Sequence, residues 1–420
     1  MRGFDVCRRV GGRRALSAVA VAAVAAVALG GAWAVPGAAA ASRSAGAPPD
    51  QRGRLLSVTE VVDLSPAQVQ AAIAPFFGVV STARYAITGY RITYSTIDAE
   101  GRPTTASGLV ALPAGAGRDL HVISYDHGTN PTRDAVASVT AGDGDREAVE
   151  LFASAGFAAA APDYLGLGTG PGTHPYMDLS SEVTASTDML GASRQLAATH
   201  GVTLDPRVLV TGFSQGGPAS MGLARAIQEG RADGYWKLGA VAPISGPYHV
   251  RTAEVPALSR GELDPESAIL YIAFWTVSMN RLHHLYENPA TVFQQPYAAT
   301  VESLFDGDHS EQDILASLPG TPTALLTPHY LARLRHPTGA LLRAMRQNDT
   351  SCDWHPDVPV RLYGADGDHA VAFANSWQCQ AELAAHGDRV TLVDVGDVDH
   401  NTSAERSVPL VLEFLTERAH

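Results

Sequence analysis

The stretch RVLVTGFSQGGPASMGLARAIQE, residues 207–229, predicts the centre of the fold. Residues 207–211 are typical of a buried strand, and residues 218–229 have the apolar spacing of a helix. Between them stands a G-x-S-x-G pattern with Ser214 at its middle. Glycines two positions before and after the serine are expected where a tight turn leaves no room for a Cβ. The stretch therefore predicts a strand, a sharp turn that exposes Ser214, and a helix whose amino end faces that serine.

Signals of strands and helices alternate on both sides of this stretch. Short apolar strands that alternate with helices indicate a mostly parallel sheet with helices on both faces. We predict further strands over residues 85–96, 104–112, 120–125, 157–161, 238–244, 360–363 and 390–395, and further helices over residues 146–155, 183–200, 371–386 and 404–418.

The alternation stops between residues 245 and 357. This segment is too long for a loop, and its helix-like pieces are separated by Pro and Gly. We expect an inserted helical cap there, between two parts of one α/β core over residues 55–244 and 358–420. Residues 269–286 are too apolar for a solvated helix. They fit either an acyl-binding wall over Ser214 or the cap's own small core.

A serine hydroxyl acts as a nucleophile when a base takes its proton and a carboxylate orients that base. His400 follows the strand at 390–395 and precedes the last helix, where the base is expected. Two carboxyls, Asp366 and Asp368, follow the strand at 360–363. In an extended segment both point the same way, so periodicity cannot separate them. We choose Asp368 as the acid and keep Asp366 as the alternative.

Two backbone N–H groups are expected to hold the oxyanion of an attacked carbonyl. One belongs to Gln215, directly after the serine, and the other to Thr129, in the His127-Gly128-Thr129 loop after the strand at 120–125. The alternative is that Ser214 is a bystander in a structural turn. A serine peptidase, an acyltransferase and a non-catalytic binding protein would also fit this framework.

Several short motifs together resemble a known family. These are YDHGT at 125–129, DYLGLG at 163–168, HPY at 174–176, GFSQGG at 212–217 and SGPY at 245–248. They are similar to secreted lipases and esterases of the Candida antarctica lipase A type, including their bacterial relatives. The resemblance runs from about residue 55 to the C-terminus and is weakest through the cap.

The resemblance implies the α/β-hydrolase fold and hydrolysis of carboxylic esters through an acyl-enzyme. It also implies a helical lid between the sixth and seventh strands, and no cofactor. The family's Ser, Asp and His correspond to Ser214, Asp368 and His400. Ala372 stands where the family has a proline after its D-x-x-V pattern, which keeps Asp366 open. No metal site is expected, because His283-His284 lack the spacing of a zinc motif.

The first 41 residues have the order of a secretory signal peptide: a basic stretch, an apolar run, then small residues. A membrane anchor is the alternative. Residues 42–54 are predicted to be a flexible lead-in. Cleavage after Ala41 would remove five Arg and one Asp, so the formal charge would change from −13 to −17.

Such an acidic protein is a poor partner for nucleic acid or an anionic membrane. We expect an exported, extracellular protein that acts on a small-molecule or lipid ester and at most touches a lipid interface transiently. Export also favours a disulfide between Cys352 and Cys379, the two cysteines that remain after cleavage.

Overall fold

The computed structural model describes residues 51–386 and 390–419. The predicted signal peptide and most of the predicted lead-in lie outside the described residues. The part of the lead-in that is described, residues 51–54, contacts the core. Arg52 pairs with Asp188 at 3.0 Å, and the Gly53 N–H donates to the Ser95 carbonyl at 2.8 Å. Among the helices of the described residues, none has both the length and the apolar character needed to cross a membrane.

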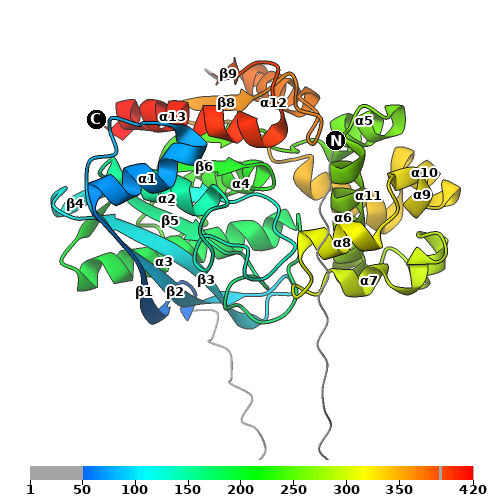
Figure 1. The fold of residues 1–420 in the computed structure, drawn as a ribbon, viewed down its shortest axis with the longest axis horizontal. Helices are drawn as coiled ribbons and strands as arrows, with labels where there is room; N and C mark the ends of the chain where they lie inside the picture. The colour runs from blue at the N-terminus through cyan, green and yellow to red at the C-terminus, as the bar shows by residue number, and fades with distance from the viewer. Residues whose placement is uncertain (1–50, 387–389, 420) are drawn as a thin grey trace, which may run out of the picture. The chain divides into compact units, whose positions relative to one another are not determined.

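A nine-stranded sheet forms the centre of the core, in the order β1-β2-β3-β5-β4-β6-β7-β8-β9 (Figure 1). The pairs β1–β2, β2–β3 and β3–β5 are antiparallel, and the remaining neighbours are parallel. The mostly parallel sheet predicted from the sequence is therefore confirmed. The strands are β1 Leu55–Leu64, β2 Ile87–Ile97, β3 Pro103–Pro113, β4 Asp119–Asp126, β5 Ala158–Pro162, β6 Thr203–Phe213, β7 Lys237–Ile244, β8 Val360–Gly364 and β9 Val390–Asp394.

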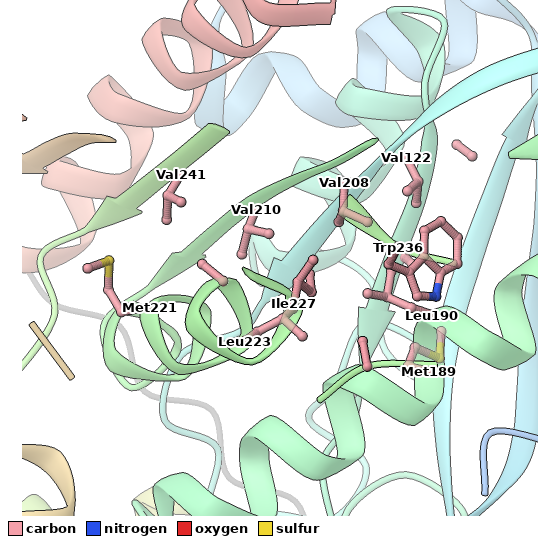
Figure 2. Close-up of a cluster of buried hydrophobic side chains, with 14 of the residues drawn as sticks. Val122, Met189, Leu190, Val208, Val210, Met221, Leu223, Ile227, Trp236 and Val241 are labelled. Carbon is pink, nitrogen blue, oxygen red and sulfur yellow. The ribbon is translucent and has the colours of Figure 1, made fainter. Parts of the chain in front are cut away.

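Helices cover both faces of this sheet, as predicted. One face carries α1 (Pro66–Phe77), α2 (Asp145–Ser154) and α13 (His400–Ala419), and the other carries α3 (Leu179–Thr199), α4 (Gly216–Gln228) and α12 (Ala374–Ala385). The strands supply both apolar layers by alternation. In β6, Val208 and Val210 pack against α3 and α4 (Figure 2). Leu209 of the same strand belongs to the apolar cluster on the opposite face. This arrangement explains why the central residues of β6, Val208 to Val210, are all apolar.

Two elements of the core were not predicted, namely β1 and α1. β1 is an edge strand whose residues are mostly exposed, so it lacks the apolar alternation that marks a half-buried strand. α1 begins at a local capping signal. The Ser65 hydroxyl accepts the Gln68 N–H, while the Gln68 side chain accepts the Ser65 N–H. Pro66 occupies the first helical position, where its missing N–H costs nothing.

The segment between β7 and β8 forms a helical cap. A π-helical turn at Val250–Glu254 precedes the first cap helix. The cap helices are α5 Val255–Arg260, α6 Pro265–His283, α7 Val301–Leu304, α8 Glu311–Ser317, α9 Pro322–Leu325, α10 Pro328–Arg335 and α11 Gly339–Asn348, with short 3₁₀ turns at Pro289–Thr291 and Tyr297–Ala299. Both ends of the cap leave the sheet close together, because β7 and β8 are neighbours and the Ser245 N–H donates to the Tyr363 carbonyl at 2.9 Å.

The cap has an apolar cluster of its own, and α6 crosses it. Ile269, Leu270, Phe274 and Val277 of α6 are buried in this cluster. Ala268, Tyr271, Ile272 and Trp275 recur at helical spacing on another face and line a pocket beside Ser214. One face of this apolar helix thus packs in the cap's own core, as one interpretation predicted, and another face lines a pocket beside Ser214.

The predicted disulfide is present. Cys352 lies after α11 and Cys379 lies in α12, and their Cα atoms are 5.3 Å apart. Both cysteines are fully buried. The bond joins the end of the cap segment to a core helix.

Candidate active site

Ser214 lies on the sharp turn between β6 and α4. Its φ of 54° is in the left-handed region, which a residue with a side chain enters at a cost in conformational energy. The Ser214 N–H donates to the Ile244 carbonyl at 3.0 Å. A Cβ at Gly212 or Gly216 would collide with carbonyl oxygens, including that of Asp126 in β4. The glycine spacing is therefore a steric requirement of the turn.

Ser214, His400 and Asp368 form one hydrogen-bonded chain. His400 Nδ1 is 2.6 Å from Asp368 Oδ2, and His400 Nε2 is 2.8 Å from Ser214 Oγ. A carboxylate only accepts, so Nδ1 carries the proton and a neutral ring leaves Nε2 bare. Nε2 can then accept the serine proton. All three side chains are buried, with exposed fractions of 3% for Ser214, 7% for His400 and 5% for Asp368.

The structure places Asp368, and not Asp366, against His400. The chain turns directly after β8, and the Asp368 N–H donates to the Ala365 carbonyl at 3.2 Å. Oδ1 of Asp368 accepts the N–H groups of Ala370 and Val371, each at 2.9 Å, which fixes the carboxylate. The Asp366 side chain is exposed. The two carboxyls do not share one direction, because this segment is a turn and not an extended strand.

His400 is the first residue of α13, which begins four residues earlier than predicted. Asp399 marks this start, because its carboxylate accepts the Thr402 N–H and the Thr402 hydroxyl at 2.9 and 2.8 Å. These hydrogen bonds hold the pKa of Asp399 below its usual range. The Ser403 hydroxyl donates to the His400 carbonyl at 2.6 Å. The hydrogen bonds at the start of α13 thus fix the position of the His400 imidazole.

The two predicted oxyanion donors belong to the residue after Ser214 and to a loop that contacts Ser214. A Cβ at Gly128 would come within 3.6 Å of Ser214 Cβ, so the loop that carries Thr129 packs against the serine. Within the part of the chain that the structure describes, neither the Gln215 N–H nor the Thr129 N–H donates to a protein acceptor. The Thr129 hydroxyl is 2.9 Å from the Tyr176 hydroxyl. This arrangement offers two backbone donors beside a serine that has a base.

The fold is shared with hydrolases of known structure. A Legionella pneumophila protein assigned to the hydrolases matches 87% of the chain and 98% of its own, with a TM-score of 0.79 and 26% identity. The rice cell wall degrading esterase LipA of Xanthomonas oryzae matches 88% of the chain and 96% of its own, with a TM-score of 0.75 and 28% identity. Candida antarctica lipase A in its closed state matches 86% of the chain and 81% of its own, with a TM-score of 0.60 and 12% identity.

The chain has the α/β-hydrolase fold. The resemblance to lipases and esterases of the Candida antarctica lipase A type is confirmed, although at 12% identity the likeness to lipase A itself concerns the fold alone. No protein-family model and no curated protein matches the sequence. The family resemblance implies a cap after the sixth strand of the α/β-hydrolase fold. That strand is β7 in this structure, because β1 adds one strand at the edge of the sheet.

A layer of buried polar side chains contacts the turn that carries Ser214, here called the elbow. The sequence did not predict a role for this layer. Gln215 Nε2 is 2.9 Å from His174 Nε2 and 2.7 Å from Glu182 Oε1. Burial lowers the pKa of His174 to about 3 and raises the pKa of Glu182 to about 8. His174 belongs to the HPY motif that carried part of the family resemblance. Glu182 lies one residue before the predicted start of its helix.

Two pockets meet at Ser214. The first, here called the apolar pocket, is partly open to solvent and does not include His400. Its lining is mostly aliphatic and aromatic: Tyr176, Met177, Pro247, Val250, Val255, Leu258, Leu263, Ala268, Tyr271, Ile272, Trp275, Ala370 and Val371, with Glu254 as the one carboxyl. Burial raises the pKa of Glu254 to about 8.

The second, here called the polar pocket, contains Ser214, His400 and the Gly128-Thr129 loop. Four carboxyls line it, those of Asp143, Asp145, Glu311 and Glu405, and among the described residues no Lys or Arg does. Of the residues that the structure describes, only Ser214 and Tyr271 line both pockets. The serine therefore lies between an apolar space on one side and an acidic, polar space on the other.

Proposed function

We propose that this chain is an exported serine hydrolase that cleaves carboxylic esters through an acyl-enzyme. The observation that carries the proposal is the hydrogen-bonded chain from Ser214 through His400 to Asp368, next to two N–H groups that have no protein acceptor among the described residues. The esterase and hydrolase names of the neighbours at 26–28% identity favour the same reaction. The buried disulfide and the predicted signal peptide favour export.

In the first half-reaction, Ser214 Oγ attacks the acyl carbon while His400 Nε2 takes its proton. Asp368 holds the imidazole in the required tautomer and stabilises the imidazolium that forms. The carbonyl oxygen becomes an oxyanion, and the N–H groups of Gln215 and Thr129 donate to it. His400 then returns the proton to the alcohol oxygen, the ester C–O bond breaks, and the acyl group remains on Ser214. Water repeats the sequence and releases the acid.

The position of His400 assigns the two pockets. His400 must reach the oxygen of the leaving alcohol to protonate it, so the alcohol has to lie on the side of the serine that contains His400. That side is the polar pocket. The apolar pocket, which touches Ser214 but not His400, is left for the acyl chain. The preferred substrate is therefore an ester of an apolar acid with a polar alcohol.

Replacing the nucleophile tests the proposal. In Ser214→Ala, we expect kcat/KM for p-nitrophenyl butyrate to fall by about 10³-fold or more, because no acyl-enzyme can form. A fluorophosphonate probe should label the wild type and not the variant. Ser57→Ala, on the exposed face of β1, is the matched control and should keep both properties. Near-normal hydrolysis by Ser214→Ala would refute the mechanism, and a wild type that cleaves p-nitroanilides faster than esters would refute the substrate class.

A pair of neighbouring substitutions tests the acid. We expect Asp368→Asn to lower kcat by about 10²- to 10⁴-fold, because an amide in this place favours the wrong histidine tautomer. Asp366→Asn makes the same substitution two residues earlier in the chain, where the carboxyl is exposed. Its kcat should stay within about twofold of the wild type. The two variants are compared in single-turnover experiments with p-nitrophenyl butyrate. The reverse order of effects would assign the role to Asp366.

A further inference from the structure

The polar layer beneath Ser214 centres on the side chain of Gln215, the residue whose N–H is a proposed oxyanion donor. We propose that Glu182 and His174 are positioning residues that hold the Gln215 side chain and thereby aim its backbone N–H at the oxyanion. This inference rests on the proposed ester hydrolysis. It assigns work to two buried groups, exposed by 1% and 5%, that the reaction itself does not use.

The hydrogen positions in this layer follow from the partners. His174 Nδ1 is 3.0 Å from the Leu165 carbonyl, which can only accept, so Nδ1 carries the proton. The ring is neutral because burial lowers its pKa to about 3, and Nε2 is therefore a bare acceptor. The Gln215 amide gives one hydrogen to His174 Nε2 and the other to Glu182 Oε1. A flipped amide would place its oxygen against the His174 lone pair, so one orientation is fixed.

The backbone around Gln215 gives a reason for such anchoring. Ser214 is strained at φ 54°, and Gly216 and Gly217 follow Gln215 directly. Gly216 and Gly217 have no side chain through which the surrounding structure could hold their peptide planes. Of residues 215–217, only Gln215 has a side chain that can be anchored. Two hydrogen bonds in this buried layer fix that side chain and thus limit rotation of its peptide N–H.

The same layer adds a pH dependence with a definite sign. Burial raises the pKa of Glu182 to about 8, so the group is neutral below this pH and negative above it. A negative charge under the elbow opposes the negative charge of the oxyanion, so kcat should fall as pH rises through about 8. No cation contacts Glu182 among the described residues. The titratable groups that face it are Asp178 at the start of α3, Asp126 in β4, and His174, Tyr164 and Tyr176 in the preceding loop.

Two substitutions separate positioning from mere stability. Glu182→Gln keeps an acceptor for Gln215 and is neutral at every pH. We expect the kcat of this variant at pH 7 to stay within about threefold of the wild type. In the wild type, kcat should fall by about tenfold between pH 7 and pH 9.5, and in the variant this fall should disappear. Glu182→Leu removes the acceptor. Its kcat should fall by about 10- to 100-fold at all pH values while KM changes by less than about threefold.

Asp126→Asn is the matched control, because it also neutralises a buried carboxyl but does not contact Gln215. Its carboxyl raises the pKa of Glu182, so the alkaline fall should remain and move to slightly lower pH. Both kcat and KM for p-nitrophenyl butyrate are determined at each pH, so that weaker substrate binding caused by ionisation of Glu254 in the apolar pocket is seen in KM. Thermal unfolding identifies variants that are not folded.

The outcomes are distinct. If Glu182→Leu keeps the wild-type kcat, or Glu182→Gln keeps the alkaline fall, the positioning role is wrong while ester hydrolysis stands. If Glu182→Leu does not fold, Gln215→Leu, which keeps the peptide N–H but loses the anchored side chain, must show the same loss of kcat. A wild type that hydrolyses no ester refutes the proposed function and this inference together.

Discussion

The apolar pocket and the polar pocket share Ser214, but different parts of the chain build them. The apolar pocket takes most of its lining from the cap and the turn that leads into it. The polar pocket is lined by α1, by the segment before α2 and by α13, and of the cap only Tyr271 and Glu311 reach it. Under the proposed function, acyl selectivity is thus encoded in an insertion, whereas proton transfer and the alcohol site belong to the sheet and its helices.

Of the two pockets, the apolar one should give the larger change in substrate selectivity when it is filled. Leu258 lines it from α5, and Leu258→Trp adds bulk to this space. We expect kcat/KM for p-nitrophenyl octanoate to fall by about 100-fold, with the acetate ester changed by less than about threefold, because only the longer acyl chain needs the lost volume. Leu56→Trp on the exposed face of β1 is the control and should leave both rates unchanged. An equal loss for both esters would contradict the assignment of this pocket to the acyl chain.

A smaller effect should appear on the alcohol side. Four carboxyls line the polar pocket, so a cationic alcohol should be favoured over an uncharged one of the same shape. Butyrylcholine and 3,3-dimethylbutyl butyrate are such a pair. We expect kcat/KM to be about three- to tenfold higher for butyrylcholine at low ionic strength. The ratio should fall in about 0.5 M salt, because salt screens the attraction between exposed charges.

Glu405 and Glu413 offer a matched test of that selectivity, since both lie on α13 and only Glu405 lines the polar pocket. Glu405→Gln should lower the ratio between the two esters, and Glu413→Gln should not. A ratio near one in the wild type, or an equal response to both substitutions, would mean that the alcohol does not occupy this pocket.

The sequence predicts the core of the molecule well, because its strands and helices are separated by clear turn residues. β2 to β9 and every helix on the two faces except α1 follow from hydrophobic periodicity together with these turn residues. β1 escapes because its exposed residues have no buried face to alternate with. The short cap helices escape for a related reason, since they pack around their own cluster and not along one sheet.

The site is predictable in part. The placement of Ser214 and His400 follows from the order of strands, but the acid needs the turn after β8, which no periodicity describes. The positioning pair is less visible still. Glu182 and Gln215 are 33 residues apart, and their contact depends on how α3 packs against α4. A buried glutamate in a helix has no sequence mark that separates it from a solvated one.

The close spacing of the two cap ends has an evolutionary consequence. The Ser245–Tyr363 hydrogen bond brings the entry and the exit of the insertion to adjacent strands. Recombination that exchanged the segment between these points would therefore leave the sheet, the elbow and His400 in place. This layout allows a lineage of proteins to acquire new substrates by exchange of one segment, while the reaction mechanism stays the same.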